Sequence, residues 1–132
     1  MLKNFYRIVD QSLPAYQETG ISPAAGTFRF TLELDPSHPV YEGHFPGNPV
    51  VPGVCQVQII KELVSRVIGK EVNLFRSDNI KFLAMIVPAQ TPVLTVSIDV
   101  KQKEPDQWDV SAIISRDSSL FIKFKGGFRP LE

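Results

Sequence analysis

The sequence predicts an α+β fold in which an antiparallel sheet of about six strands curves around one long helix. Several segments alternate apolar and polar residues, which is the period of a strand with one buried face. Residues 52–68 instead place apolar residues at helical spacing over about half of the helix circumference. A curved sheet is the simplest cover for so broad an apolar arc.

Length and charge limit the function classes. With 132 residues, the chain is expected to form one domain, residues 1–132, with a core that needs no metal or disulfide. Lys and Arg together number 14, as do Asp and Glu, so nucleic acid is not an expected partner. No apolar run is long enough for a membrane span, and the N-terminus lacks the apolar core of a signal peptide. We therefore expect a cytoplasmic protein.

The first third of the chain predicts two strands. Phe5–Gln11 alternates weakly, and Pro14–Ala25 is rich in Pro and Gly and predicts a turn or loop. Thr27–Leu34 alternates cleanly and predicts a strand with one buried face.

A long loop and the helix follow. Asp35–Pro52 contains five prolines and two glycines, so no regular structure is expected there, and so long a loop in a small domain is usually functional. Pro52–Ile68 predicts the helix, with Gly69 as its C-cap. Gln56 interrupts the apolar arc, and the opposite stripe is polar: Gln58, Lys61, Glu62 and Ser65.

The last half of the chain predicts four strands: Asn79–Leu83, Val93–Val100, Trp108–Ser115 and Leu120–Lys125. Turn-like segments separate the last three, so these are expected to form a meander. The aromatic residues of the predicted strands are expected in the core: Phe28, Phe30, Trp108, Phe121 and Phe124.

The most informative chemistry lies where the loop meets the helix. His44 offers a titratable base, and Pro52-Gly53 opens the helix nine residues after His44. Gly53 allows a ligand close to the backbone, where free N–H groups and the helix dipole favour negative charge. A base beside an electrophilic backbone site suits removal of a proton next to a carbonyl.

Residues 38–54, His-Pro-Val-Tyr-Glu-Gly-His-Phe-Pro-Gly-Asn-Pro-Val-Val-Pro-Gly-Val, resemble the signature of the hot-dog-fold 3-hydroxyacyl-[acyl-carrier-protein] dehydratases. Residues 79–82 and 87–88 are a weaker match. The resemblance implies the hot-dog fold over nearly the whole chain and elimination of water from a thioester-bound chain. It also implies an acyl carrier protein with a phosphopantetheine arm as partner, a homodimer or higher homo-oligomer, and no cofactor.

The resemblance also implies residue roles. His44 matches the base that removes the α-proton, and the N–H groups of Gly53 and Val54 lie where the thioester oxygen is held. The family has an acidic residue fourteen positions after the histidine, to protonate the departing hydroxyl. In this chain that position is Gln58, which carries no transferable proton.

Three interpretations of Gln58 are open. Gln58 orients a water or the substrate while His44 moves the proton; or Glu62, one turn further along the helix, serves as an auxiliary acid; or the dehydratase step is lost and the protein is a non-catalytic acyl-binding partner subunit. A hot-dog acyl thioesterase is the alternative enzyme. His38 is expected to be structural and Cys55 a packed, inert thiol. Two histidines and one cysteine make no convincing metal site.

Overall fold

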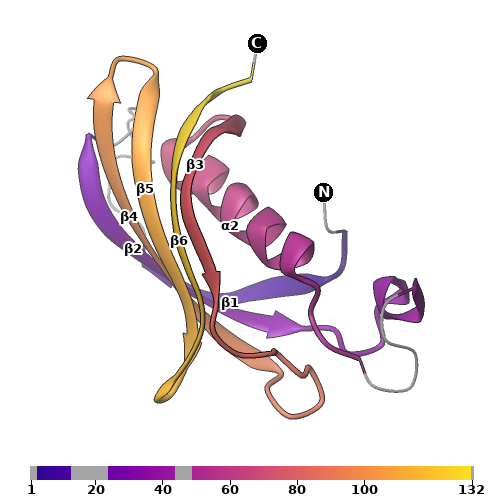
Figure 1. The fold of residues 1–132 in the computed structure, drawn as a ribbon. Coiled ribbons are helices and arrows are strands. Elements are labelled where there is room, and N and C mark those ends of the chain that lie inside the picture. The colour runs from indigo at the N-terminus through magenta and orange to yellow at the C-terminus, as the bar shows by residue number, and fades with distance from the viewer. Residues whose placement is uncertain (1–2, 13–23, 44–48, 132) are drawn as a thin grey trace.

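The computed structural model describes residues 3–12, 24–43 and 49–131, and Figure 1 shows their arrangement. The described elements in chain order are β1 (Tyr6–Ser12), β2 (Ala25–Leu34), the 3-10 helix η1 (Pro39–Gly43), α2 (Gly53–Ile68), β3 (Val72–Phe82), β4 (Val93–Glu104), β5 (Gln107–Arg116) and β6 (Ser119–Pro130).

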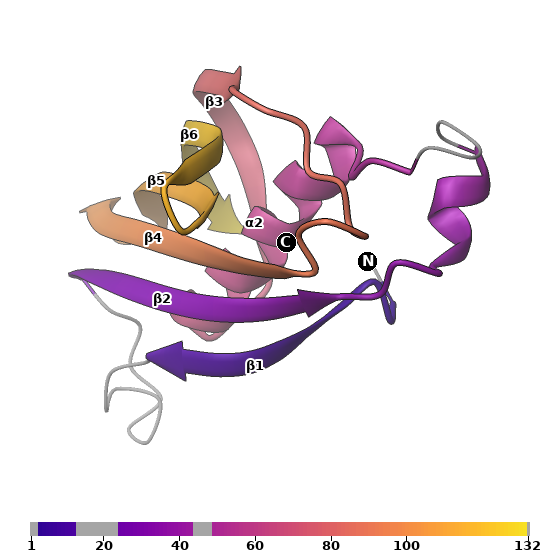
Figure 2. The same cartoon turned by 90° about the horizontal axis from the view of Figure 1, so that it is seen from below.

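The strands form one antiparallel sheet in the order β1-β2-β4-β5-β6-β3. The sheet curves, and α2 lies on its concave side (Figures 1 and 2). The predicted α+β class and the meander of β4, β5 and β6 are therefore confirmed. A six-stranded antiparallel sheet wrapped around one helix is the hot-dog fold.

The core lies between the helix and the sheet. The apolar arc of α2 is fully buried at Ile59, Leu63 and Val67, each worth about 1.5–3 kcal/mol of hydrophobic stabilisation. The five aromatic residues expected in the core are all buried. The helix ends as predicted, because Gly69 adopts a left-handed conformation with φ 85° and its N–H donates to the Ser65 carbonyl.

The largest differences from the predicted strand bounds are in β3 and β6. β3 begins at Val72 rather than Asn79, and β6 runs on to Pro130 although Gly126 and Gly127 interrupt its alternation. Gly126 packs so closely that a Cβ there would lie 2.7 Å from the Arg76 carbonyl oxygen. Glycine therefore keeps β3 and β6 paired through two register shifts, which a sequence pattern does not show.

Two local expectations are wrong. The loop of residues 35–52 includes regular structure, the 3-10 helix η1. The alternation of Leu120, Ile122 and Phe124 predicts one shared face, but Leu120 is 40% exposed, whereas Ile122 and Phe124 are buried, as is Phe121. A register shift between Ile114 and Ser115 in the β5–β6 pair changes the alternation at this point.

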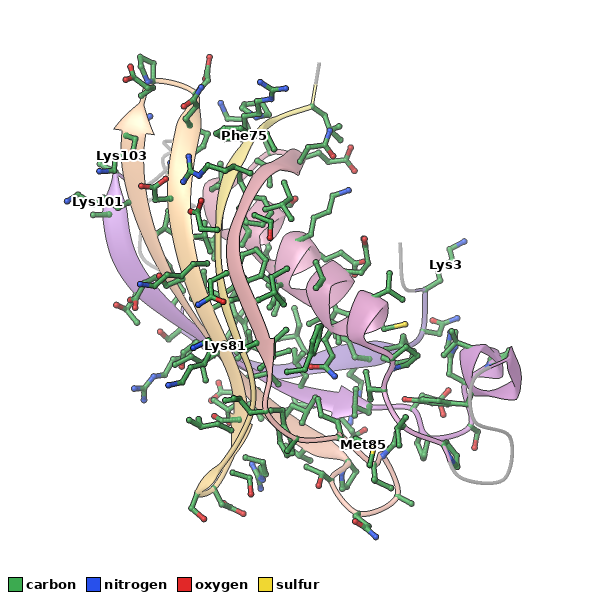
Figure 3. All side chains as sticks on the ribbon, in the orientation of Figure 1. Lys3, Phe75, Lys81, Met85, Lys101 and Lys103 are labelled. Atoms are coloured by element: carbon green, nitrogen blue, oxygen red, sulfur yellow. The ribbon has the colours of Figure 1, made fainter. Side chains whose placement is uncertain are left out.

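The outer face of the sheet carries charged residues. Figure 3 shows Lys101 and Lys103 on the side of the sheet that faces away from α2. Asp109 accepts from Arg76 at 2.6 Å and lies 3.8 Å from Lys103. Within residues 3–12, 24–43 and 49–131, no helix is both long and apolar enough to cross a membrane.

Candidate active site at the two faces of the central helix

The start of α2 presents free backbone donors. The N–H groups of Cys55 and Gln56 turn back to the Pro52 carbonyl, at 3.0 and 3.1 Å. The N–H groups of Gly53 and Val54 make no hydrogen bond to any residue in the described part of the chain. The first turn of the helix contains no acidic residue, and Pro52 provides no side-chain cap. These two N–H groups can therefore receive an oxygen that carries developing negative charge.

A largely apolar pocket of about 580 Å³ adjoins this helix start. Its lining includes Gly53, Phe82 and Met85, and the Phe82 ring lies so close that a Cβ on Gly53 would come within 2.8 Å of it. Phe82 and Met85 are 53% and 73% exposed, and Val54 on the first turn is 71% exposed. Figure 3 shows Met85 on the loop that follows β3. The predicted oxyanion position thus lies beside an exposed apolar surface.

Gln56 is a buried polar residue in the same pocket wall. Its Nε2 donates to the Val51 carbonyl at 3.2 Å, and Val51 donates in turn to the Ile86 carbonyl at 2.8 Å. Gln56 therefore ties the segment before the helix to the first turn of α2. No group in the described part of the chain donates a hydrogen bond to its buried Oε1.

Gln58 lies in a different pocket, of about 570 Å³, along the polar stripe of α2. Its Nε2 donates to Glu62 Oε2 at 2.9 Å. Tyr6, on β1, donates its hydroxyl to the other carboxylate oxygen, Glu62 Oε1, at 2.9 Å. The polar stripe is half-buried. Its hydrogen bonds converge on the Glu62 carboxylate.

Electrostatics fix the direction of these bonds. Burial, and then the nearby Glu62 carboxylate, raises the pKa of Tyr6 above its usual range, so Tyr6 stays a neutral donor at physiological pH. Lys3, Lys61 and Arg66 also line the pocket and supply positive charge. In this arrangement each oxygen of Glu62 accepts a hydrogen bond from a neighbouring side chain.

The structure does not bring all predicted site residues together. His44 lies outside the described residues. Gly53 and Gln58 are five positions apart on α2, which is about 7.5 Å along the axis and about 140° around it. They accordingly line two separate pockets. In a single chain, the predicted oxyanion position and the predicted acid position therefore lie on different faces of α2.

The two residues expected to be structural take such positions. His38 accepts from the Val40 N–H at Nδ1 and donates through Nε2 to the Lys3 carbonyl at 2.8 Å, and its ring packs edge-on against Phe5. Cys55 is a buried free thiol, and its burial raises its pKa above the ordinary value, which disfavours the reactive thiolate.

Sequence reasoning missed two residues at these pockets. The sequence places Tyr6 in a predicted strand, and Phe82 in a short predicted strand that weakly matches the family pattern, but it assigns neither residue to a site. Tyr6 meets Glu62 across 56 positions of sequence, and Phe82 meets Gly53 from the end of β3. No local pattern signals either contact. In the described ranges, no three His, Cys, Asp or Glu side chains gather closely enough to hold a metal ion.

Comparison with known proteins finds a matching family and several relatives. The family model for ApeI-like proteins, described as ApeI dehydratase, matches residues 21–119. A 3-hydroxyacyl-[acyl-carrier-protein] dehydratase FabZ from Rickettsia bellii is 29% identical over 97 residues, which cover 67% of this chain and 66% of that protein. FabZ from Rickettsia felis is 28% identical over the same length. The chain thus spans just under two thirds of the length of these curated relatives.

Solved structures agree in fold. The dehydratase heterocomplex ApeI:P from Xenorhabdus doucetiae is 16% identical with a TM-score of 0.63, covering 93% of this chain and 96% of that one. A hypothetical thioesterase from Streptococcus pneumoniae, solved with coenzyme A, is 13% identical with a TM-score of 0.63, covering 98% and 89%. At such low sequence identities the structural similarity shows a shared fold and nothing more. Since the family match extends over residues 21–119, this chain belongs to the ApeI-like dehydratase family.

Proposed function

We propose that residues 1–132 form one domain that acts on 3-hydroxyacyl chains held as thioesters on an acyl carrier protein, and that it eliminates water from them. The observation that carries the proposal is the pair of N–H groups at Gly53 and Val54, which have no partner among the described residues and open α2 beside an apolar pocket. A thioester oxygen at these donors gains stabilisation as it becomes an enolate oxygen. The FabZ relatives carry the name of this reaction.

The chemistry divides between three positions. His44 takes the α-proton, and the electron pair of the C–H bond moves toward the thioester oxygen at Gly53 and Val54. The enolate then expels the 3-hydroxyl as the C=C bond forms. The departing oxygen needs a proton to leave as water, and Gln58 has none to transfer. We propose that the proton comes from protonated His44 or from a water that Gln58 orients.

A site shared between two copies of the chain supports the same proposal. Gly53 and Gln58 line different pockets of one protomer, so a second protomer is needed to place one copy's acid position opposite the other copy's base. Exposed apolar side chains surround the helix start, at Val54, Phe82 and Met85. Covering them on a second copy removes apolar surface from water. We therefore propose a homodimer.

One observation favours a second candidate, a non-catalytic partner subunit. Gln58 is not merely present at the acid position but is bound to Glu62, so the amide is built into the site. The ApeI:P structure is described as a dehydratase heterocomplex. In this candidate the chain binds acyl chains or carrier protein and pairs with an active homologue that has an acid at the matching position.

The test uses purified protein and 3-hydroxyacyl thioesters on an acyl carrier protein, followed by enoyl absorbance and by release of free thiol. We expect enoyl product, a loss of about 10²-fold or more in His44→Ala, and little change in His38→Gln, a control in the same loop. Free thiol instead of enoyl product would identify a thioesterase. Binding without either product would favour the partner subunit. No turnover and no binding would reject both candidates.

A further inference from the structure

The Glu62 carboxylate is held from two sides. Gln58 Nε2 donates to Oε2 from one turn earlier on α2, and the Tyr6 hydroxyl donates to Oε1 from β1. Each bond is 2.9 Å long, a good length for a hydrogen bond to a charged acceptor. Both oxygens of Glu62 therefore have a donor, and its position is fixed by two separate elements of the fold.

This arrangement decides how the Gln58 amide is turned. An amide has a donor end and an acceptor end, and only the NH₂ end can face a carboxylate favourably. With Nε2 bound to Glu62, the carbonyl oxygen Oε1 is the acceptor that remains for a ligand in the pocket. A free glutamine would offer either end.

We propose that Glu62 and Tyr6 are positioning residues that lock Gln58 as a hydrogen-bond acceptor, so that the site selects chains with a hydroxyl at carbon 3. The inference rests on the proposed function, since it takes carbon 3 of a thioester-bound chain to lie at Gln58. A 3-hydroxyl donates to Oε1. A 3-oxo group brings a second acceptor against it, and a saturated chain leaves it unpaired in a half-buried pocket.

The test measures binding rather than turnover. Hexanoyl pantetheine, its 3-hydroxy form and its 3-oxo form are compared by calorimetry in His44→Ala protein, which does not consume them. We expect the 3-hydroxy form to bind about tenfold more tightly than the 3-oxo form. In Glu62→Gln on the same background the preference should fall to within about twofold, because a glutamine at 62 can face either end of Gln58. Tyr6→Phe should fall between the two.

Glu71→Gln is the matched control, because Glu71 lines the same pocket and is exposed. It should keep the tenfold preference. Nuclear magnetic resonance supplies a second readout. The side-chain NH₂ protons of Gln58 should exchange slowly with water in the parent protein and faster in Glu62→Gln, while dispersed backbone amide signals show that the variant is folded. An unchanged preference in folded Glu62→Gln would overturn the inference while leaving the dehydratase proposal standing. A hydroxyl preference without any enoyl product from wild-type protein would overturn the dehydratase proposal while leaving the positioning of Gln58 by Glu62 supported.

Discussion

Replacing Gln58 by Glu is the sharpest perturbation that this site offers. In wild-type protein the Gln58 amide nitrogen lies 2.9 Å from Glu62 Oε2. A carboxylate at position 58 would replace this hydrogen bond by a contact between two like charges. With charge centres about 4.5 Å apart and an effective dielectric of about 20, their repulsion is about 4 kcal/mol. Partial exposure and the neighbouring cations Lys61 and Arg66 reduce it to about 2–3 kcal/mol.

The molecule can avoid this repulsion by keeping one proton on the pair. The pKa of one carboxyl in Gln58→Glu therefore rises toward neutrality, and the two carboxylates come to share a proton as the pH falls below neutral, as coupled acids do. A protonated carboxyl at this place would supply a proton to the departing hydroxyl directly. We expect the rate of enoyl formation to increase by about 10²-fold or more over wild type, since a positioned acid contributes about 10²–10⁴-fold.

The assay is enoyl absorbance with a 3-hydroxyacyl-acyl-carrier-protein substrate across pH 5–9. The gain should disappear at high pH, as the shared proton is lost. In the double variant Gln58→Glu with Glu62→Gln, the repulsion is absent, so the gain should shift to lower pH. A folded Gln58→Glu protein that binds substrate and forms no more enoyl product than wild type at any pH would refute the reasoning.

Further predictions follow from particular contacts. Tyr6→Phe removes one donor from the Glu62 carboxylate and should lower the free energy of unfolding in urea by about 1.5–3 kcal/mol at neutral pH. Because the pKa of Tyr6 is raised on folding, this stabilisation is complete at neutral pH and should decrease at alkaline pH as Tyr6 ionises. Gly126→Ala brings a Cβ within 2.7 Å of the Arg76 carbonyl oxygen and should cost about 1–3 kcal/mol in the same measurement, whereas a change of 0.5 kcal/mol or less would contradict the packing. Cys55 should resist alkylation by iodoacetamide at pH 7.5 until urea unfolds the protein, because burial raises its pKa; fast labelling of the native protein would contradict this.

Most of the fold could be predicted because it follows from periodicity. The apolar arc of residues 52–68 requires a curved partner, and the alternating segments provide it. What failed were features that depend on particular neighbours. The extension of β6 past Gly126 depends on a close approach to β3, and the exposure of Leu120 depends on a register shift with β5. Neither leaves a trace in the local pattern.

The candidate site was likewise predictable only where it depends on a local motif. A motif is a local signal, and it correctly placed Gly53 at the start of the helix with its N–H free of described partners. The same motif predicts that Gln58 occupies the position of the family's acid. It does not predict which side chains Gln58 contacts. Glu62 accepts from Gln58 and from Tyr6, and its role as an auxiliary acid stays a prediction. The contact between Tyr6 and Glu62 joins residues 56 positions apart, so only the folded chain reveals it.

The identity of residue 58 is therefore coupled to that of residue 62. On an exposed helix face, two carboxylates four positions apart cost a few tenths of a kcal/mol, which solvent and salt tolerate. Beneath Tyr6, in a half-buried pocket, the same pair costs several times more, and a neutral amide beside a carboxylate removes that cost. Gln58 thus avoids the repulsion that a second carboxylate would create beside Glu62, but its amide has no proton to transfer. By repulsion, Glu62 would raise the pKa of an acid introduced at position 58 and enlarge its protonated fraction. The carboxylate that favours an amide at position 58 would therefore also favour the proton-carrying form of an acidic replacement.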